Sequence, residues 1–219
     1  MKNTTLLPYL TAMGIDVFAP RQSTAATTAI IPPTLNWERL QQQAATCQRC
    51  SLHQTRTQTV FGVGNRQAAL MIIGEAPGFY EDQQGMPFVG RAGQLLTAML
   101  QAIGLAREDV YIANILKCRP PNNRDPLPEE VQSCTPFLEQ QITLIQPKLL
   151  LAVGRIAAHY LLKQKSSLET LRGKIHYFSK SHTPLIVTFH PAYLLRNPQD
   201  KKKALIDLQF VHDTLQPIH

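Results

Sequence analysis

Runs of hydrophobic residues alternate along this chain with stretches in which apolar positions recur every three or four residues. Four mainly apolar runs cover residues 69–73, 110–118, 149–154 and 184–189. Helix-like patterns cover residues 37–46, 91–103, 128–145, 155–163 and 198–215. Buried strands that alternate with helices are typical of a mainly parallel sheet with both faces covered. The pattern therefore predicts an α/β fold of three α/β/α layers around a central, mainly parallel four-stranded sheet.

The first 36 residues differ from the rest of the chain. Residues 9–21 form a short apolar patch, and residues 22–36 are rich in Thr, Ala, Ser and Pro. Such a composition is typical of a flexible linker. We expect residues 1–36 to be a docking or fold-back segment with its linker, and residues 37–219 to form one domain, since that length can bury a full core.

Polar side chains stand where the predicted strands end. Glu75 follows the first strand, Asn114 lies within the second, and His190 follows the fourth. Ligand sites in open α/β sheets gather at the carboxyl ends of strands, so these side chains are expected to share one crevice. The loop 74–93 after the first strand adds the aromatic Phe88, next to Pro87, and five glycines that allow close approach of backbone to a ligand.

Four cysteines form a second candidate site, and two of them make a Cys-x-x-Cys pair: Cys47, Cys50, Cys118 and Cys134. In an intracellular protein such a pair is more often a metal or redox site than a disulfide. A thioredoxin-like pair is disfavoured, because Cys47 follows a helix instead of opening one after a strand. Four thiolates suit either zinc or an iron–sulfur cluster.

Charge and composition narrow the class of partner. The net charge is +7 and the pI is near 9.4, which favours a polyanionic partner without identifying it. No apolar run is long enough to cross a bilayer, and the first residues lack the apolar core of a signal peptide. We therefore expect a cytoplasmic protein with no membrane partner.

Three motifs together resemble the family 4 uracil-DNA glycosylases, the iron–sulfur type of the uracil-DNA glycosylase superfamily. They are residues 74–78 with 87–93, residues 114–121, and residues 190–196, and the similarity runs from about residue 37 to the end. The resemblance implies a DNA repair enzyme of base excision repair that flips uracil out of DNA and hydrolyses its N-glycosidic bond. It also implies that the four cysteines hold a [4Fe–4S] cluster.

The resemblance assigns roles around the base. Phe88 would stack on the flipped uracil, and Asn114 would pair with its N3–H and O4. His190 would stabilise the negative charge that develops on O2 as the bond breaks. These roles need all three side chains in one pocket.

The motifs do not settle which residue activates the attacking water. Glu75 is the candidate to position or deprotonate the attacking water. Because Ala76 replaces the Asp of other superfamily branches, the alternative is that the enzyme has no dedicated base. Ala76 and Gly78 are expected to contact the substrate. Gly78 replaces the bulky residue that excludes the thymine methyl group in some relatives, so Glu81 or Tyr80 is expected to fill that space.

DNA contacts are expected from basic and apolar residues near the same motifs. The candidates for phosphate contacts are Arg91, Lys117, Arg119 and Arg196. Leu194 or Leu195 would be the apolar wedge that enters the base stack vacated by uracil.

Two other functions fit parts of this pattern. A relative that traps uracil-DNA covalently would carry Gln in place of Ala76 and a basic insertion ending in His near the third cysteine, and this chain has neither. A non-catalytic DNA-binding protein or a redox sensor would not need Glu75, Phe88, Asn114 and His190 together. The chain is expected to be a monomer, and residues 9–21, which resemble the N-terminal segment of the psi subunit of the bacterial clamp loader, are a candidate contact with the replication machinery.

Overall fold

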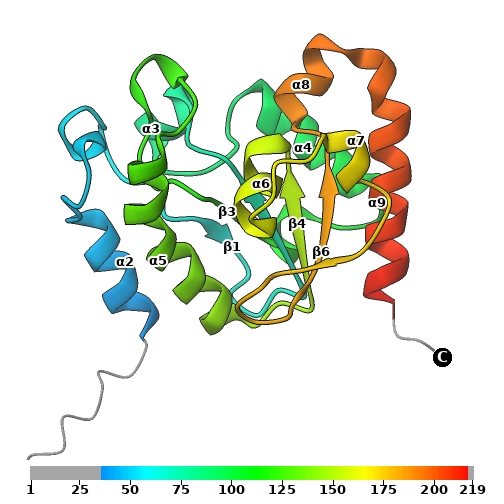
Figure 1. Cartoon of the computed structure of the whole chain (residues 1–219), viewed down its shortest axis with the longest axis horizontal. Helices are drawn as coiled ribbons and strands as arrows, with labels where there is room; N and C mark the ends of the chain where they lie inside the picture. The colour runs from blue at the N-terminus through cyan, green and yellow to red at the C-terminus, as the bar shows by residue number, and fades with distance from the viewer. Residues whose placement is uncertain (1–35, 217–219) are drawn as a thin grey trace, which may run out of the picture. The chain divides into compact units, whose positions relative to one another are not determined.

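A six-stranded sheet with the order β1-β3-β2-β4-β6-β5 forms the middle of the fold (Figure 1). The computed structural model describes residues 36–216, so the predicted docking patch at residues 9–21 lies outside the described residues. The four inner strands are parallel: β3 (Tyr111–Asn114), β2 (Leu70–Gly74), β4 (Leu149–Val153) and β6 (Pro184–Thr188). They correspond to the four apolar runs of the sequence.

Each edge of the sheet carries one short antiparallel strand. These are β1 (Val63–Gly64), which pairs with β3, and β5 (His176–Tyr177), which pairs with β6. The predicted fold class is confirmed, whereas the predicted number of strands was too small by two. A strand of two residues contains too little periodic pattern to be recognised from the sequence.

Helices cover both faces of the sheet, because side chains of successive strand residues point to opposite faces. Met71 and Ile73 pack into one apolar core, and Leu70 and Ile72 pack into the other. The first core includes side chains of α2 (Trp37–Ala45), α5 (Pro128–Ile145), α6 (Arg155–Leu162) and α7 (Leu168–Leu171). The second includes side chains of α4 (Arg91–Gln101), α8 (Pro191–Arg196) and α9 (Lys201–Leu215).

The boundaries of most elements agree with the sequence pattern, with a few differences. The strand predicted over residues 110–118 ends at Asn114, and residues 198–200 form a 3₁₀ turn before α9. The short helix α3 (Phe79–Gln84) lies inside the glycine-rich loop and was not predicted. It ends at Gly85, whose φ of 72° is in the left-handed region, as is common after a helix.

The carboxyl ends of the four parallel strands all face the same edge of the sheet, the upper edge in Figure 1. The segments that follow these strands contain α3, α6 and α8, and the Pro-rich turn after β3. Within residues 36–216, no helix combines the length and the apolar character that crossing a membrane requires.

Candidate active site

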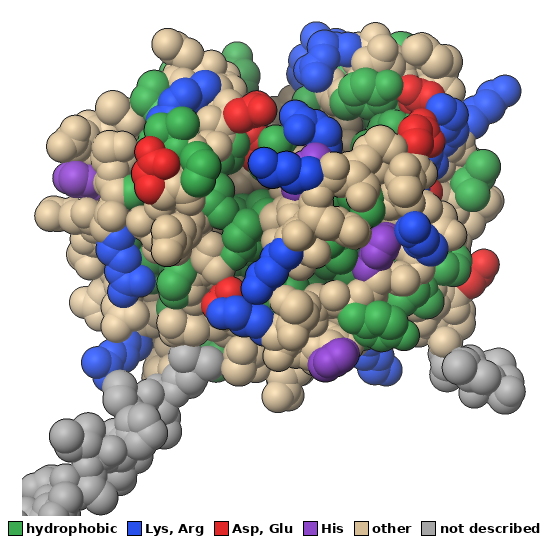
Figure 2. All heavy atoms as spheres, viewed as in Figure 1, with side chains coloured by type: hydrophobic (Ala, Val, Ile, Leu, Met, Phe, Trp, Pro, Cys, Tyr) green, Lys and Arg blue, Asp and Glu red, His purple; other side chains and the backbone are tan. Residues whose placement is uncertain are grey.

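A cavity of about 430 Å³ opens at the carboxyl edge of the sheet. Figure 2 shows the molecule hollowed at this edge, with Lys and Arg side chains on its rim. The structure brings together here the residues that the sequence placed in one crevice: Glu75, Ala76, Gly78, Phe88, Asn114, His190 and Arg196.

Asn114, the last residue of β3, carries a polar atom that lacks a partner. Its side chain is buried, and among residues 36–216 its Oδ1 has no hydrogen-bond partner. Gly74 lies beside it in the neighbouring strand, and a Cβ there would come within 2.3 Å of Oδ1. A buried unpaired oxygen costs folding free energy, so it is retained where a ligand N–H completes the bond.

Phe88 is held beside Asn114 by an unusual backbone. Its φ of 54° lies in the left-handed region, which is rare for a bulky residue and typical of functional sites. Gly93 permits this turn, because a Cβ at that position would lie 1.7 Å from the Phe88 carbonyl oxygen. The centres of the Phe88 and His190 rings are 5.6 Å apart, so both rings border the same space.

His190 caps the first turn of α8 and is fixed in one tautomer. Its Nδ1 accepts a hydrogen bond from the Ala192 N–H at 3.1 Å, so the neutral ring carries its proton on Nε2. Burial and the positive charge of Arg196 lower the pKa of His190 to about 4. At neutral pH the side chain is therefore an uncharged hydrogen-bond donor.

Glu75 lies at the junction of this cavity and a second one of about 460 Å³. Burial and the negative charge of Asp125 raise the pKa of Glu75 to about 7, and Arg155 opposes that change. A carboxylate with such a pKa can accept a proton near neutral pH.

Glu81 fills the space beside Gly78. The sequence predicted that either Glu81 or Tyr80 would do so. Its Oε1 accepts hydrogen bonds from the Val89 N–H at 3.0 Å and the Gly90 N–H at 3.2 Å. Its Oε2 would lie 2.7 Å from a Cβ at Gly78. Tyr80 is 61% exposed and is not part of the cavity wall.

Two of the predicted DNA contacts are wrong, because their side chains are buried. The Lys117 ammonium donates to the Asn114 carbonyl oxygen at 2.8 Å and to Gln141 Oε1 at 2.6 Å. Leu194 is fully buried in the core between the sheet, α4 and α9. Lys117 therefore supports the backbone of Asn114 and cannot reach a phosphate.

The remaining predicted DNA contacts are accessible and stay predictions. Arg91 and Arg196 are exposed, Arg119 is partly exposed, and Leu195 is 36% exposed beside the buried Leu194. Arg196 lines both cavities.

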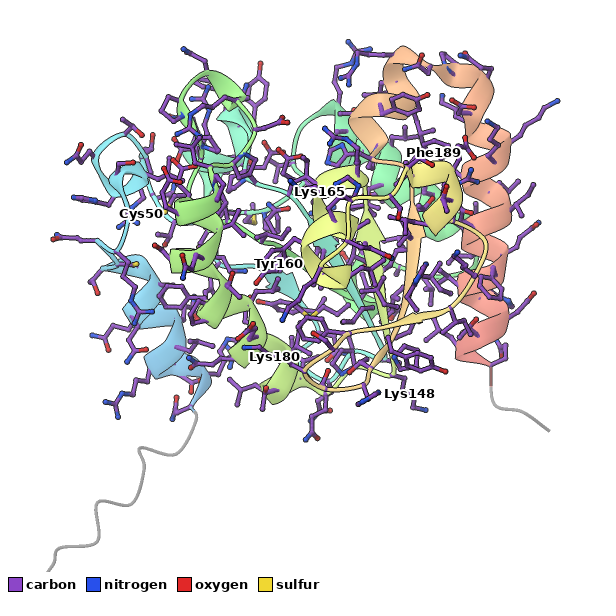
Figure 3. The ribbon with its side chains drawn as sticks, viewed as in Figure 1. Cys50, Lys148, Tyr160, Lys165, Lys180 and Phe189 are labelled. Carbon is purple, nitrogen blue, oxygen red and sulfur yellow. The ribbon has the colours of Figure 1, made fainter. Side chains whose placement is uncertain are left out.

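The four cysteines line one small cavity between the segment after α2, the segment after β3 and α5. Figure 3 labels Cys50 beside the upper part of α5. Arg56 donates to the Cys118 sulfur at 3.0 Å, and the Lys117 backbone N–H donates to the Cys134 sulfur at 3.2 Å. Burial raises the pKa of both thiols, so without a bound cation they favour the protonated form.

The thiols do not form a site for a single metal ion. Over the described range 36–216, no three or more His, Cys, Asp or Glu side chains are arranged to hold one ion. All four cysteines nevertheless surround one cavity, and two of their sulfurs accept hydrogen bonds, as sulfurs of iron–sulfur clusters do. Four thiolates around one cavity are a donor set that either zinc or an iron–sulfur cluster can accept.

Comparison with known proteins identifies the family. The model of the uracil DNA glycosylase superfamily matches residues 61–209. This range includes every residue that lines the 430 Å³ cavity at the carboxyl edge of the sheet. The chain belongs to the uracil-DNA glycosylase superfamily. The resemblance seen in its sequence motifs is thereby confirmed.

Several similar proteins are type-4 uracil-DNA glycosylases. The one from Archaeoglobus fulgidus is 45% identical over 169 residues, which are 74% of this chain and 85% of the relative. The one from Thermotoga maritima is 45% identical over 162 residues, 73% of this chain and 83% of the relative. The one from Saccharolobus solfataricus is 42% identical over 187 residues, 82% of this chain and 87% of the relative.

Proposed function

We propose that this glycosylase excises uracil in DNA repair, hydrolysing the N-glycosidic bond to release free uracil and leave an abasic site. The unpaired Oδ1 of the buried Asn114, beside Phe88 and a neutral His190, is the observation that carries the proposal. The relatives named type-4 uracil-DNA glycosylases support it.

Recognition requires uracil to leave the base stack. A base inside a duplex is inaccessible to an enzyme pocket, so the nucleotide is flipped out and its ring stacks on Phe88. Asn114 Oδ1 then accepts the uracil N3–H, and the Asn114 amide group donates to O4. Cytosine presents the reverse pattern at these two positions, so it would leave buried polar groups mispaired.

Cleavage leaves the electron pair of the N-glycosidic bond on uracil. The negative charge spreads to O2, where the Nε2–H of His190 donates a hydrogen bond. Glu75 accepts a proton from the water that attacks the sugar carbon. The water supplies the hydroxyl group of the abasic sugar.

Exclusion of thymine is assigned to Glu81. Its carboxylate is fixed by two backbone N–H groups and occupies the space that Gly78 leaves free. A rigid carboxylate there would clash with a methyl group on C5 of the base. Arg91, Arg119 and Arg196 hold the phosphates, and Leu195 enters the stack in place of uracil.

Replacement of Asn114 by Leu tests the reading of the base. Leu has nearly the same size but can neither accept from N3–H nor donate to O4. We expect kcat/KM on uracil-containing single strands to fall by about 10². Steady-state uracil release measures this, and an unchanged rate with a normal unfolding midpoint would show that Asn114 does not read the base.

The cofactor is assigned to the four-cysteine cavity. A [4Fe–4S] cluster bound by Cys47, Cys50, Cys118 and Cys134 would cross-link three segments of the chain that lie far apart in sequence. Base excision transfers no electron, so its role is structural. Through the bonds of Lys117 to Asn114 and Cys134, the cluster site also supports the strand end that reads uracil.

Purified protein is expected to be yellow-brown and to contain about four iron atoms and no stoichiometric zinc. Cys134→Ser should lose the colour and lower the thermal unfolding midpoint, because the cross-link is weakened. Ser133→Ala, which changes a neighbouring residue of the same cavity, should keep both the colour and the unfolding midpoint of the original protein. Colourless protein with bound zinc would contradict the assignment.

A further inference from the structure

Two neighbouring aromatic side chains stand exposed at the rim of the active-site cavity. Phe79 is 50% exposed and Tyr80 is 61% exposed, at the start of α3. The residues on either side of them, Gly78 and Glu81, line the cavity. Only one other aromatic side chain in the described part of the chain is comparably exposed, Tyr177 at 58%. Adjacent exposed apolar side chains beside a binding cavity are candidates for contact with its ligand.

The pair is held in a fixed arrangement. The two ring centres are 5.4 Å apart with an interplanar angle of 81°, so the rings pack edge to face. The Arg119 guanidinium lies over the Phe79 ring, 5.1 Å from its centre. The Nε of Arg119 also donates to Asn123 Oδ1 at 2.7 Å, and Asn123 lines the cavity. The aromatic surface and a positive charge therefore lie together on one part of the rim.

We propose that Phe79 and Tyr80 form a stacking platform for a base next to the flipped uracil, with Arg119 beside it for the adjoining phosphate. The inference rests on the proposed function, because the flipped nucleotide fixes where its neighbours must pass. The DNA strand is continuous, so the nucleotides on either side of the uracil leave the cavity over its rim. Aromatic faces next to basic groups are how proteins hold single-stranded DNA without sequence preference.

The platform distinguishes between double-stranded and single-stranded DNA that contains uracil. In a duplex, the bases that flank uracil stay stacked and paired within the helix, so they do not occupy an aromatic surface on the enzyme. In a single strand they are free to stack on it. Phe79 and Tyr80 therefore act as a binding subsite that favours uracil in single-stranded DNA.

The test compares substrate forms for variants of the full chain. Phe79→Ala/Tyr80→Ala is expected to raise KM for a uracil-containing single strand about tenfold, with kcat within twofold of the original protein. KM for the matched duplex should change less than threefold. Tyr177→Ala is the control, because Tyr177 is equally exposed but pairs with Pro184 at the opposite end of β6 from His190. It should leave both KM values unchanged.

Two further measurements separate stacking from charge. Phe79→Trp should keep the single-strand KM, and Phe79→Leu should raise it, because Leu is apolar but cannot stack. The salt dependence of single-strand binding should keep its slope in Phe79→Leu, since that slope counts phosphate contacts.

Equal KM changes for both substrate forms, or a Phe79→Leu variant that binds like the original protein, would overturn the proposal. If the unaltered protein binds single strands through Phe79 but releases no uracil, the proposed function fails and the platform stands.

Discussion

His190→Ala is expected to lower the rate of uracil release by about 10² to 10³-fold under single-turnover conditions, as for loss of one donor in an oxyanion hole. The Nδ1 bond to the Ala192 N–H leaves the ring proton on Nε2, His190 lines the cavity, and burial keeps the ring neutral. A neutral N–H donor stabilises the negative charge that develops on O2 as the bond breaks. A loss of only a few-fold would contradict this role.

His190 also caps α8, so a structural effect must be separated from the catalytic one. Loss of an N-cap side chain typically costs about 1 kcal/mol of stability. His190→Asn keeps a cap acceptor but shortens the side chain, so we expect a normal unfolding midpoint and the same loss of rate. His212→Ala, at a solvent-facing histidine of α9, serves as the control and should leave the rate unchanged.

Glu75→Gln is expected to lower the rate by about 10² to 10⁴-fold, the usual contribution of a general base. Because burial and Asp125 raise the pKa of Glu75 to about 7, kcat/KM of the unaltered protein should fall about tenfold per pH unit below pH 7 and level off above it. His190, with a pKa of about 4, stays neutral over this range and adds no second step. In Glu75→Gln the residual rate should be independent of pH between about 5.5 and 8.

The raised pKa of Glu75 makes activity increase with pH but makes the stability of the folded protein decrease with pH. In the unfolded chain the Glu75 carboxyl ionises near its usual pKa of 4.5, but in the folded protein it ionises only near 7. Between these values the folded state binds more protons, so stability decreases as pH rises through this window. Glu75→Gln should therefore raise the unfolding midpoint at pH 8 while it lowers activity, which excludes misfolding as the cause.

Asp125→Asn gives a second check on the pH profile. Asp125 raises the pKa of Glu75, and it also pairs at 3.8 Å with Arg155, which lowers that pKa. Its removal should move the midpoint of the pH profile to lower pH. A profile that does not move in this variant and persists in Glu75→Gln would assign the ionisation to another group.

Sequence signals were sufficient where several of them coincide on one element. The limits of α5 match the prediction because Pro128 opens the helix and the Glu130 carboxylate reaches back to the Leu127 N–H at 2.8 Å. The convergence of Glu75, Asn114 and His190 followed from parallel strands whose carboxyl ends share one edge. Local pattern and overall topology agree at these positions.

Side-chain direction within a motif could not be read from the sequence. Leu194 and Leu195 are adjacent and chemically identical, yet Leu194 is buried in the core and Leu195 faces solvent. Lys117 precedes Cys118 and was predicted to contact a phosphate. Its side chain is buried instead, because Gln141 of α5 accepts a hydrogen bond from its ammonium group. Only the packing of α5 against the sheet decides this. Gln141 itself carries no local signal that would have singled it out.

Uracil excision is tested by the release of free base when purified protein acts on DNA strands that differ at only one position. The four strands contain uracil, cytosine, thymine or hypoxanthine there. We expect free uracil and an alkali-sensitive abasic site in the uracil strand, and no release of cytosine or thymine. Binding of uracil-DNA without release of base, or a covalent complex in place of turnover, would contradict it.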